Sequence, residues 1–133
     1  DIINAKVKFR ELWRPFCPSA TVEDGPLYFD YAGELPYMIV ACDARPDMEN
    51  RIPSVIHCDH TVRVQSVSRT TNPRFHSLIH RFKALTGYGV VLNTSFNVKG
   101  EPIVCAPQDA VDTFLKSGID VLAIGNYLAW KAE

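Results

Sequence analysis

The clearest periodic segment of the chain has apolar residues three and four positions apart, the spacing of one face of an α-helix. It runs over Pro73–Thr86. Asn72 is a good N-cap, Pro73 is favoured at the first helical position, and Gly87 ends the pattern. We therefore predict a helix with one apolar stripe, made of Phe75, Leu78, Ile79, Phe82 and Leu85.

Two shorter helices are predicted at residues 2–11 and 107–117. Two prolines within residues 15–18 forbid a continuation of the first helix, because proline removes an amide donor and clashes with the preceding turn. In the second helix, Ala106 stands where a capping serine is expected. We therefore expect Asp109 to satisfy the free amides of its first turn.

Shorter apolar runs bounded by polar or turn-forming residues are typical of β-strands. One such run, Val90-Val91-Leu92, leads directly into the polar sequence LNTSFN. Helices mixed with strands predict an α/β or α+β fold with an open sheet. The predicted strands are residues 37–42, 54–59, 61–68, 90–92, 101–105, 121–124 and 127–131.

Residues 23–36 have the composition of a surface loop but contain three aromatic residues, Tyr28, Phe29 and Tyr31. We expect these rings to dock on another surface. One hypothesis is that they mark an interdomain surface of a fragment that is inert outside its parent protein.

The size and charge of the chain exclude several classes of protein. Its 133 residues suffice for one domain, and its hydrophobic (47%) and charged (22%) fractions are those of a soluble globular protein. A net charge of -1 predicts neither a nucleic-acid partner nor a membrane partner. No signal peptide and no membrane-spanning run is visible. Four widely spaced cysteines predict reduced thiols in a cytoplasmic protein.

The stretch GVVLNTSFNVKGEPIV is the first candidate for a ligand site. Backbone amides become free where a strand ends in an open α/β sheet, and small polar side chains there commonly hold a ligand. Asn93, Ser95 and Asn97 can each donate and accept hydrogen bonds, and Gly100 permits close approach of the backbone. The alternative is a polar turn whose asparagines satisfy their own backbone.

The stretch TVRVQSVSR is the second candidate. Side chains alternate along a strand, so Val62 and Val64 point to one face while Arg63 and Gln65 point to the other. Arginine suits bidentate contact with phosphate or carboxylate. The alternative is a solvated sheet face.

The segment KVKFRELWRPF concentrates basic charge near the start of the chain. An ion pair between Lys8 and Glu11 at helical spacing is the simplest interpretation of part of it. Arg14 lies beyond the predicted helix end, so a helical ion pair on the surface does not account for it. Together with the two stretches above, this segment favours a small polyanionic ligand.

Two histidine patterns have spacings that could bind a metal. His76 and His80 lie four residues apart on the polar side of the predicted 73–86 helix, and no acidic or cysteine ligand accompanies them. The run His57-Cys58-Asp59-His60 falls at a strand turn, where adjacent side chains point apart. We predict no metal site in this chain and assign both patterns to the surface or the scaffold.

Four segments together resemble the C-terminal domain of the O-carbamoyltransferases, a family that includes the nodulation protein NodU and carbamoyltransferases of antibiotic biosynthesis. The resemblance runs from residue 3 to residue 131, nearly the whole chain. It implies an α/β, YrdC-like open twisted mixed sheet flanked by helices. The segments are KFRELWRPFCPS, TVRVQSVSRTTNPRF, TGYGVVLNTSFNVKGEPIV and PQDAVDTFLKSGIDVLAIGNYLAWK.

The same resemblance implies a reaction and a set of site residues. The C-terminal domain of the family takes carbamoyl phosphate and ATP, with Mg, and forms carbamoyladenylate. A larger actin-like N-terminal domain, which carries iron, then transfers the carbamoyl group to an acceptor hydroxyl. Carried over by motif, the phosphate and carbamoyl contacts of the family fall on Lys8, Arg14, Arg63, Asn93 and Ser95. We predict Lys8, Arg14, Arg63 and Ser95 as catalytic residues. We predict Asn93 as a substrate- or nucleotide-binding residue, together with its neighbours Thr94 and Asn97 and with Gln65 of the second candidate stretch.

The chain also departs from the family pattern. A glycine- and arginine-containing segment that precedes the first helix in the family is missing. We therefore expect residues 1–133 to be a C-terminal domain truncated at its N-terminal edge and lacking its N-terminal partner domain. We expect this isolated fragment to have weak activity or none. Cys17 stands where alanine is usual, and Ala106 where serine is usual. The alternative function is a YrdC-like module that binds nucleotide without turnover.

Overall fold

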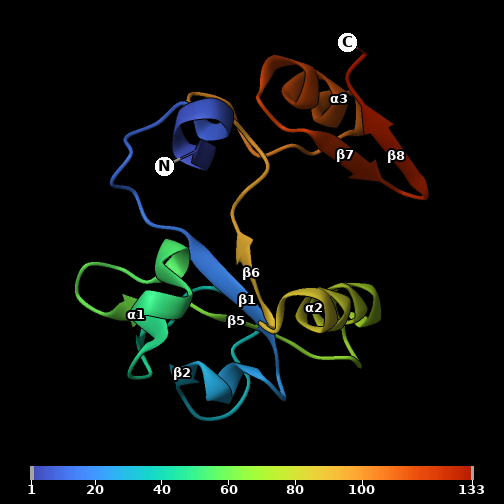
Figure 1. The fold of residues 1–133 in the computed structure, drawn as a ribbon. Helices are drawn as coiled ribbons and strands as arrows, with labels where there is room; N and C mark the ends of the chain where they lie inside the picture. The colour runs from blue at the N-terminus through green and yellow to red at the C-terminus, as the bar shows by residue number, and fades with distance from the viewer. Residues whose placement is uncertain (1, 133) are drawn as a thin grey trace. The chain divides into compact units, whose positions relative to one another are not determined.

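A computed structural model describes residues 2–132, which form two compact units (Figure 1). The central unit is Pro15–Thr94. The terminal unit combines the two ends of the chain, up to Arg14 and from Ser95 onward. Among the described residues, no helix is long and apolar enough to span a membrane.

The central unit is built on a three-stranded mixed sheet, which confirms the predicted α/β class. Its strand order is β5 (Gln65–Val67), β1 (Cys17–Thr21), β6 (Val90–Asn93). β1 pairs with β5 in parallel and with β6 antiparallel. The helix α2 (Pro73–Thr86) joins β5 to β6 and packs against β1 and β6. The bounds, the Asn72 N-cap and the left-handed Gly87 C-cap of α2 are as predicted.

A second, antiparallel sheet completes the central unit. Its strand order is β2 (Phe29–Asp30), β3 (Cys42–Ala44), β4 (Thr61–Val62). Three short helices accompany it, η2 (Gly25–Leu27), α1 (Met48–Arg51) and η3 (Pro53–Val55). The core beneath consists of Ala20, Tyr28, Phe29, Met48, Val55, Val62, Val64 and Val90.

The aromatic residues of the 23–36 loop belong to this core. Phe29 is fully buried and Tyr28 nearly so. The Tyr28 hydroxyl also accepts a hydrogen bond from the Gly89 amide (2.9 Å). The prediction that these rings form a docking surface is therefore wrong, because the core of their own unit already covers them.

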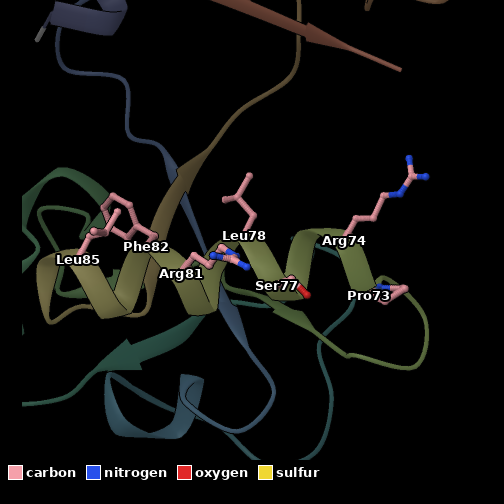
Figure 2. Close-up of a pocket in the computed structure, with 7 residues that line it drawn as sticks. All are labelled: Pro73, Arg74, Ser77, Leu78, Arg81, Phe82 and Leu85. Atoms are coloured by element: carbon pink, nitrogen blue, oxygen red, sulfur yellow. The ribbon is translucent and has the colours of Figure 1, made fainter. Parts of the chain in front are cut away.

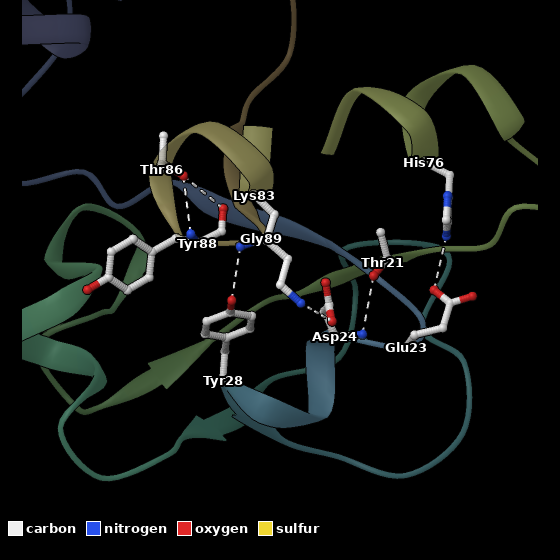
Figure 3. Close-up of polar contacts among 9 residues, drawn as sticks. All are labelled: Thr21, Glu23, Asp24, Tyr28, His76, Lys83, Thr86, Tyr88 and Gly89. Carbon is white, nitrogen blue, oxygen red and sulfur yellow. Dashed lines mark hydrogen bonds and ion pairs between the residues drawn. The ribbon is translucent and has the colours of Figure 1, made fainter. Parts of the chain in front are cut away.

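The buried face of α2 differs from the predicted apolar stripe. Figure 2 shows stripe residues that line an exposed face of the helix, and Figure 3 shows the contacts of its buried face. Ile79 alone of the stripe is fully buried, whereas Leu78, Phe82 and Leu85 are exposed. The expected solvent-facing side packs instead: His76 Nε2 lies 3.0 Å from Glu23 Oε2, and Lys83 Nζ lies 2.7 Å from Asp24 Oδ1. Residues three or four apart share a helix face, so these two contacts hold the face with His76, Ile79 and Lys83 against the rest of the unit. The exposed face also carries Pro73, Arg74, Ser77 and Arg81.

The terminal unit contains η1 (Ile3–Lys8), a π-helical turn, α3 (Pro107–Lys116) and a hairpin of β7 (Val121–Ile124) with β8 (Tyr127–Trp130). Its small core is formed by Ala110, Phe114 and Leu122. The Asp109 carboxylate accepts a hydrogen bond from the Ala106 amide (2.9 Å), which confirms its predicted capping role. Gly118 ties α3 to η1, because its amide donates to the Lys6 carbonyl (2.8 Å) and a Cβ there would lie 2.6 Å from that oxygen.

Several other predicted elements are wrong. The first helix ends at Lys8, since Phe9 adopts a left-handed conformation (φ 49°). Residues 37–41 form a turn, and pairing begins only at Cys42. Pro53 opens a 3₁₀ turn where a strand was predicted, and residues 101–105 are not a strand. The predicted 61–68 strand divides into β4 and β5, which belong to different sheets.

Candidate functional site

Lys8 lies at the centre of a hydrogen-bond network in the terminal unit. It is only 4% exposed, and its ammonium group approaches the Ser95 carbonyl (2.7 Å), the Asn97 carbonyl (2.7 Å) and Asn97 Oδ1 (2.7 Å). A fourth, longer contact reaches Ser95 Oγ (3.2 Å). The expected ion pair with Glu11 is wrong, because the ammonium group turns toward residues 95–97. The amine therefore holds the turn that follows the LNT sequence.

The side chains of this turn are also tied to one another. Ser95 Oγ donates to Asn97 Oδ1 (2.7 Å), and Asn97 Nδ2 donates to the Glu101 carbonyl (2.9 Å). Burial lowers the pKa of the Lys8 amine below the usual lysine value, and the positive charges of Arg10 and Arg14 lower it further. A buried cation with an adjacent hydroxyl is suited to stabilising negative charge.

The basic residues that follow η1 are held in place by Asn4, which is almost fully buried. Asn4 Nδ2 donates to the carbonyls of Leu12 (3.1 Å) and Arg14 (2.9 Å), and its Oδ1 accepts from Arg10 Nε (2.7 Å). The Arg14 guanidinium makes a long, exposed ion pair with Glu11 (3.8 Å). Asn4 is a positioning residue that the sequence analysis missed, since a lone asparagine in a short helix carries no distinctive signal.

A second network lies on the three-stranded sheet of the central unit. Ser19 on β1, Gln65 on β5 and Asn93 on β6 share one face, because Ser19 is in register with Gln65 and Cys17 with Asn93. Ser19 Oγ donates to Gln65 Oε1 (2.8 Å). Asn93 Nδ2 donates to both Ser19 Oγ (3.0 Å) and Gln65 Oε1 (2.9 Å). Gln65 and Asn93 were predicted as ligand contacts, whereas Ser19 was not.

Arg63 and Thr94 stand apart from this network. Arg63 is exposed, and among residues 2–132 its guanidinium has no hydrogen-bond or ion-pair partner. The neighbouring Val62 and Val64 are fully buried, which confirms the predicted alternation. Thr94 is half-buried and follows the last residue of β6.

Two of the four histidines contact a carboxylate within the described part of the chain. His76 pairs with Glu23, and His60 pairs with Glu49. Within the described part of the chain, no three His, Cys, Asp or Glu side chains gather as a metal site. The four cysteines are free thiols, of which Cys58 and Cys105 are exposed.

Comparison with known proteins identifies the family. The family model "Carbamoyltransferase C-terminus" matches residues 1–131. The nodulation protein NolO of Bradyrhizobium diazoefficiens is 43% identical over 98% of this chain and 24% of its own length. An uncharacterized protein of Synechocystis is 38% identical (98% and 25%), and the 3'-hydroxymethylcephem-O-carbamoyltransferase of Amycolatopsis lactamdurans is 35% identical (100% and 25%).

These relatives are much longer than the chain, which spans about a quarter of their length. Within that quarter, the match includes both polar networks and the basic segment after η1. The chain therefore belongs to the carbamoyltransferase C-terminal family.

Proposed function

We propose that this chain is the carbamoyladenylate-forming part of an O-carbamoyltransferase. It binds carbamoyl phosphate and ATP, with Mg²⁺ as the partner of the ATP phosphates. A larger actin-like domain of the parent protein, which would carry iron, then transfers the carbamoyl group to an acceptor hydroxyl. The observation that carries the proposal is the Lys8–Ser95–Asn97 network within a chain that matches the carbamoyltransferase family along its whole length.

The proposed reaction consumes one water. Carbamoyl phosphate, ATP and water give carbamoyladenylate, pyrophosphate and phosphate. Water cleaves the acyl phosphate bond of carbamoyl phosphate, which releases phosphate and leaves carbamate. A carbamate oxygen then forms a bond to the α-phosphorus of ATP, while the bond from that phosphorus to pyrophosphate breaks. Such a displacement depends on alignment and charge neutralisation more than on a covalent nucleophile.

The roles of the terminal-unit residues follow from their contacts. The Lys8 ammonium has three N–H groups and four oxygens around it, so a phosphate oxygen would have to displace one of them. The longest contact, to Ser95 Oγ at 3.2 Å, is the one most readily exchanged. Ser95 then serves as a hydrogen-bonding positioner. A nucleophilic serine needs a base, and the terminal unit contains no histidine.

The arginines would contact phosphate directly. Arg63 is exposed and has no partner among the described residues, so it can offer its full guanidinium fork to a phosphate. Arg14 would exchange its long contact with Glu11 for a ligand oxygen. Thr94 and Asn97 would contribute hydroxyl and amide groups to the nucleotide or carbamoyl group.

Pyrophosphate release tests the proposal and separates it from the alternative of a nucleotide-binding module without turnover. We expect the 133-residue chain with ATP and Mg²⁺ to release pyrophosphate slowly, and only when carbamoyl phosphate is added. Arg63→Ala should reduce this rate at least about tenfold. Arg69→Ala is the matched control, since Arg69 is also exposed near β5. ATP binding without carbamoyl-phosphate-dependent pyrophosphate would support the alternative.

A further inference from the structure

In the network of Ser19, Gln65 and Asn93, each side-chain atom has a defined role as hydrogen-bond donor or acceptor. A backbone carbonyl next to Gln65 sets these roles. Gln65 Nε2 donates to the Pro36 carbonyl (3.2 Å). A carbonyl can only accept, so this contact requires the amide nitrogen of Gln65 on the Pro36 side. The Gln65 oxygen, Oε1, is thereby directed toward Ser19 and Asn93.

This arrangement determines the orientation of Asn93. Its side-chain atom nearest Gln65 Oε1 lies 2.9 Å away and must be a donor, because two amide oxygens at that distance would repel each other. That atom is Nδ2, which also donates to Ser19 Oγ at 3.0 Å. Both hydrogens of Nδ2 are thus used within the sheet. The only remaining polar group of the Asn93 side chain is Oδ1, a pure acceptor.

The Ser19 hydroxyl stabilises this orientation of the Asn93 amide. It is fully buried on the central strand β1, and its hydroxyl accepts from Asn93 while donating to Gln65 Oε1 (2.8 Å). Without that hydroxyl, the hydrogen bond from Asn93 to Gln65 would be the only one left to set the amide orientation. Ser19 therefore acts on any ligand only through Asn93, as a positioning residue.

We propose that this network selects the carbamoyl group by presenting Asn93 Oδ1 to its amine. The inference rests on the proposed function. An acceptor repels phosphate oxygens, so Asn93 faces the N–H of a carbamoyl group and not a phosphate. A methyl group in place of the amine would offer Asn93 Oδ1 no hydrogen-bond donor. Binding would then leave this oxygen without a partner, which costs binding free energy. The chain should consequently discriminate carbamoyl phosphate from acetyl phosphate, which has a methyl group in place of the amine.

The test compares the dissociation constants of carbamoyl phosphate and acetyl phosphate for the 133-residue chain, measured by NMR titration of its labelled amides with ATP and Mg²⁺ present. We expect wild type to bind carbamoyl phosphate about tenfold more tightly. Ser19→Ala should reduce this ratio to about two or three. If Ser19→Ala does not fold, Gln65→Met, at a half-buried position, removes the same constraint on Asn93.

Ser66→Ala is the matched control. Ser66 is also buried and lies next to Gln65 on β5, but its hydroxyl accepts from the Leu35 amide (2.6 Å) and lies outside the network. The control should keep the full discrimination. Equal affinity of wild type for both acyl phosphates, or full discrimination in the folded Ser19 and Gln65 variants, would overturn this inference and leave the proposed function standing. Failure of wild type to bind either acyl phosphate would overturn both.

Discussion

The two polar networks of this protein both contain serine and asparagine side chains, but only one of them contains a charged group. In the terminal unit, one buried ammonium group organises a turn by attracting four oxygens. In the central unit, three neutral side chains on adjacent strands orient one another, and a carbonyl sets their direction. The first arrangement provides charge, whereas the second provides a defined donor and acceptor pattern. Charge suits the phosphates of a ligand, and fixed polarity suits its amide.

The difference predicts unequal energies. Hydrogen bonds to a charged group contribute about 1.5–3 kcal/mol each, against about 1 kcal/mol for neutral ones. We therefore expect substitutions in the charged network to cost more stability than substitutions in the neutral network.

Removing the central charge should have the largest effect. Lys8→Met leaves the carbonyls of Ser95 and Asn97 without their donor, so we expect the free energy of unfolding of the terminal unit to fall by about 3 kcal/mol. Urea unfolding, followed by amide resonances of α3, measures this loss. Lys6→Met is the control, because Lys6 is exposed on the same helical turn. An equal loss in both variants would mean that Lys8 does not organise the turn.

The neutral network should show smaller but measurable coupling. In a double-mutant cycle of Ser19→Ala with Asn93→Ala, we expect a coupling free energy of about 1 kcal/mol in the stability of the central unit. The same cycle with Ser66→Ala in place of Ser19→Ala should show almost none. Additive losses for Ser19 and Asn93 would contradict the network.

The pH dependence should distinguish the networks, since only the first contains a titrating group. The pKa of Lys8 is lowered in the folded state by burial and by Arg10 and Arg14. The unfolded chain therefore binds the proton more tightly, and this lysine makes a contribution to stability that rises with pH between its folded pKa and the ordinary value of about 10.4. The urea midpoint of wild type relative to Lys8→Met should rise from about pH 8 to about pH 10. A falling difference would contradict the direction of the shift.

Arg63→Ala should have the smallest effect on stability. Its side chain is exposed and unpaired among the described residues, so we expect the free energy of unfolding to change by less than about 0.5 kcal/mol. Urea unfolding of the variant beside Arg69→Ala checks this. A large loss would show that Arg63 is a structural residue and weaken its assignment to phosphate.

Local signals in the sequence predicted α2 and α3 well. α2 has an N-cap, a favourable proline and a terminal glycine, and all three act as expected. Which face of α2 is buried was not predictable, because the contacts of His76 with Glu23 and of Lys83 with Asp24 join residues about 50 to 60 positions apart. Hydrophobic periodicity defines a stripe but cannot show which part of it the rest of the fold covers.

The strands were less predictable than α2 and α3, because some of their residues are unusual for their positions in a sheet. β1 is the central strand of its sheet yet contains Pro18, whereas proline is normally confined to edge strands. We therefore assigned the two prolines to the end of a helix and missed the strand, and with it Ser19. Residues 37–41 have strand-like composition, but Tyr37 and Ile39 are exposed and unpaired in a sheet.

The candidate site was only partly predictable. The resemblance to the family indicated Lys8 and Ser95, and the polar stretch after β6 indicated Asn97. The structure joins all three in one network. The sequence suggested an ion pair of Lys8 with Glu11, because spacing alone cannot anticipate that the helix ends at Phe9 and redirects the amine. Asn4 and Ser19 act through partners distant in sequence, and no pattern in the sequence marked them.

The proposed function requires this chain to bind carbamoyl phosphate and ATP. The most direct measurement is an NMR titration of the labelled 133-residue chain with ATP, Mg²⁺ and carbamoyl phosphate. Our account predicts that amides of residues 93–97 and those around Arg63 shift in wild type, and that these shifts are lost in Arg63→Ala and retained in Arg69→Ala. Shifts confined to other parts of the chain, or none at all with saturating ligand, would contradict it.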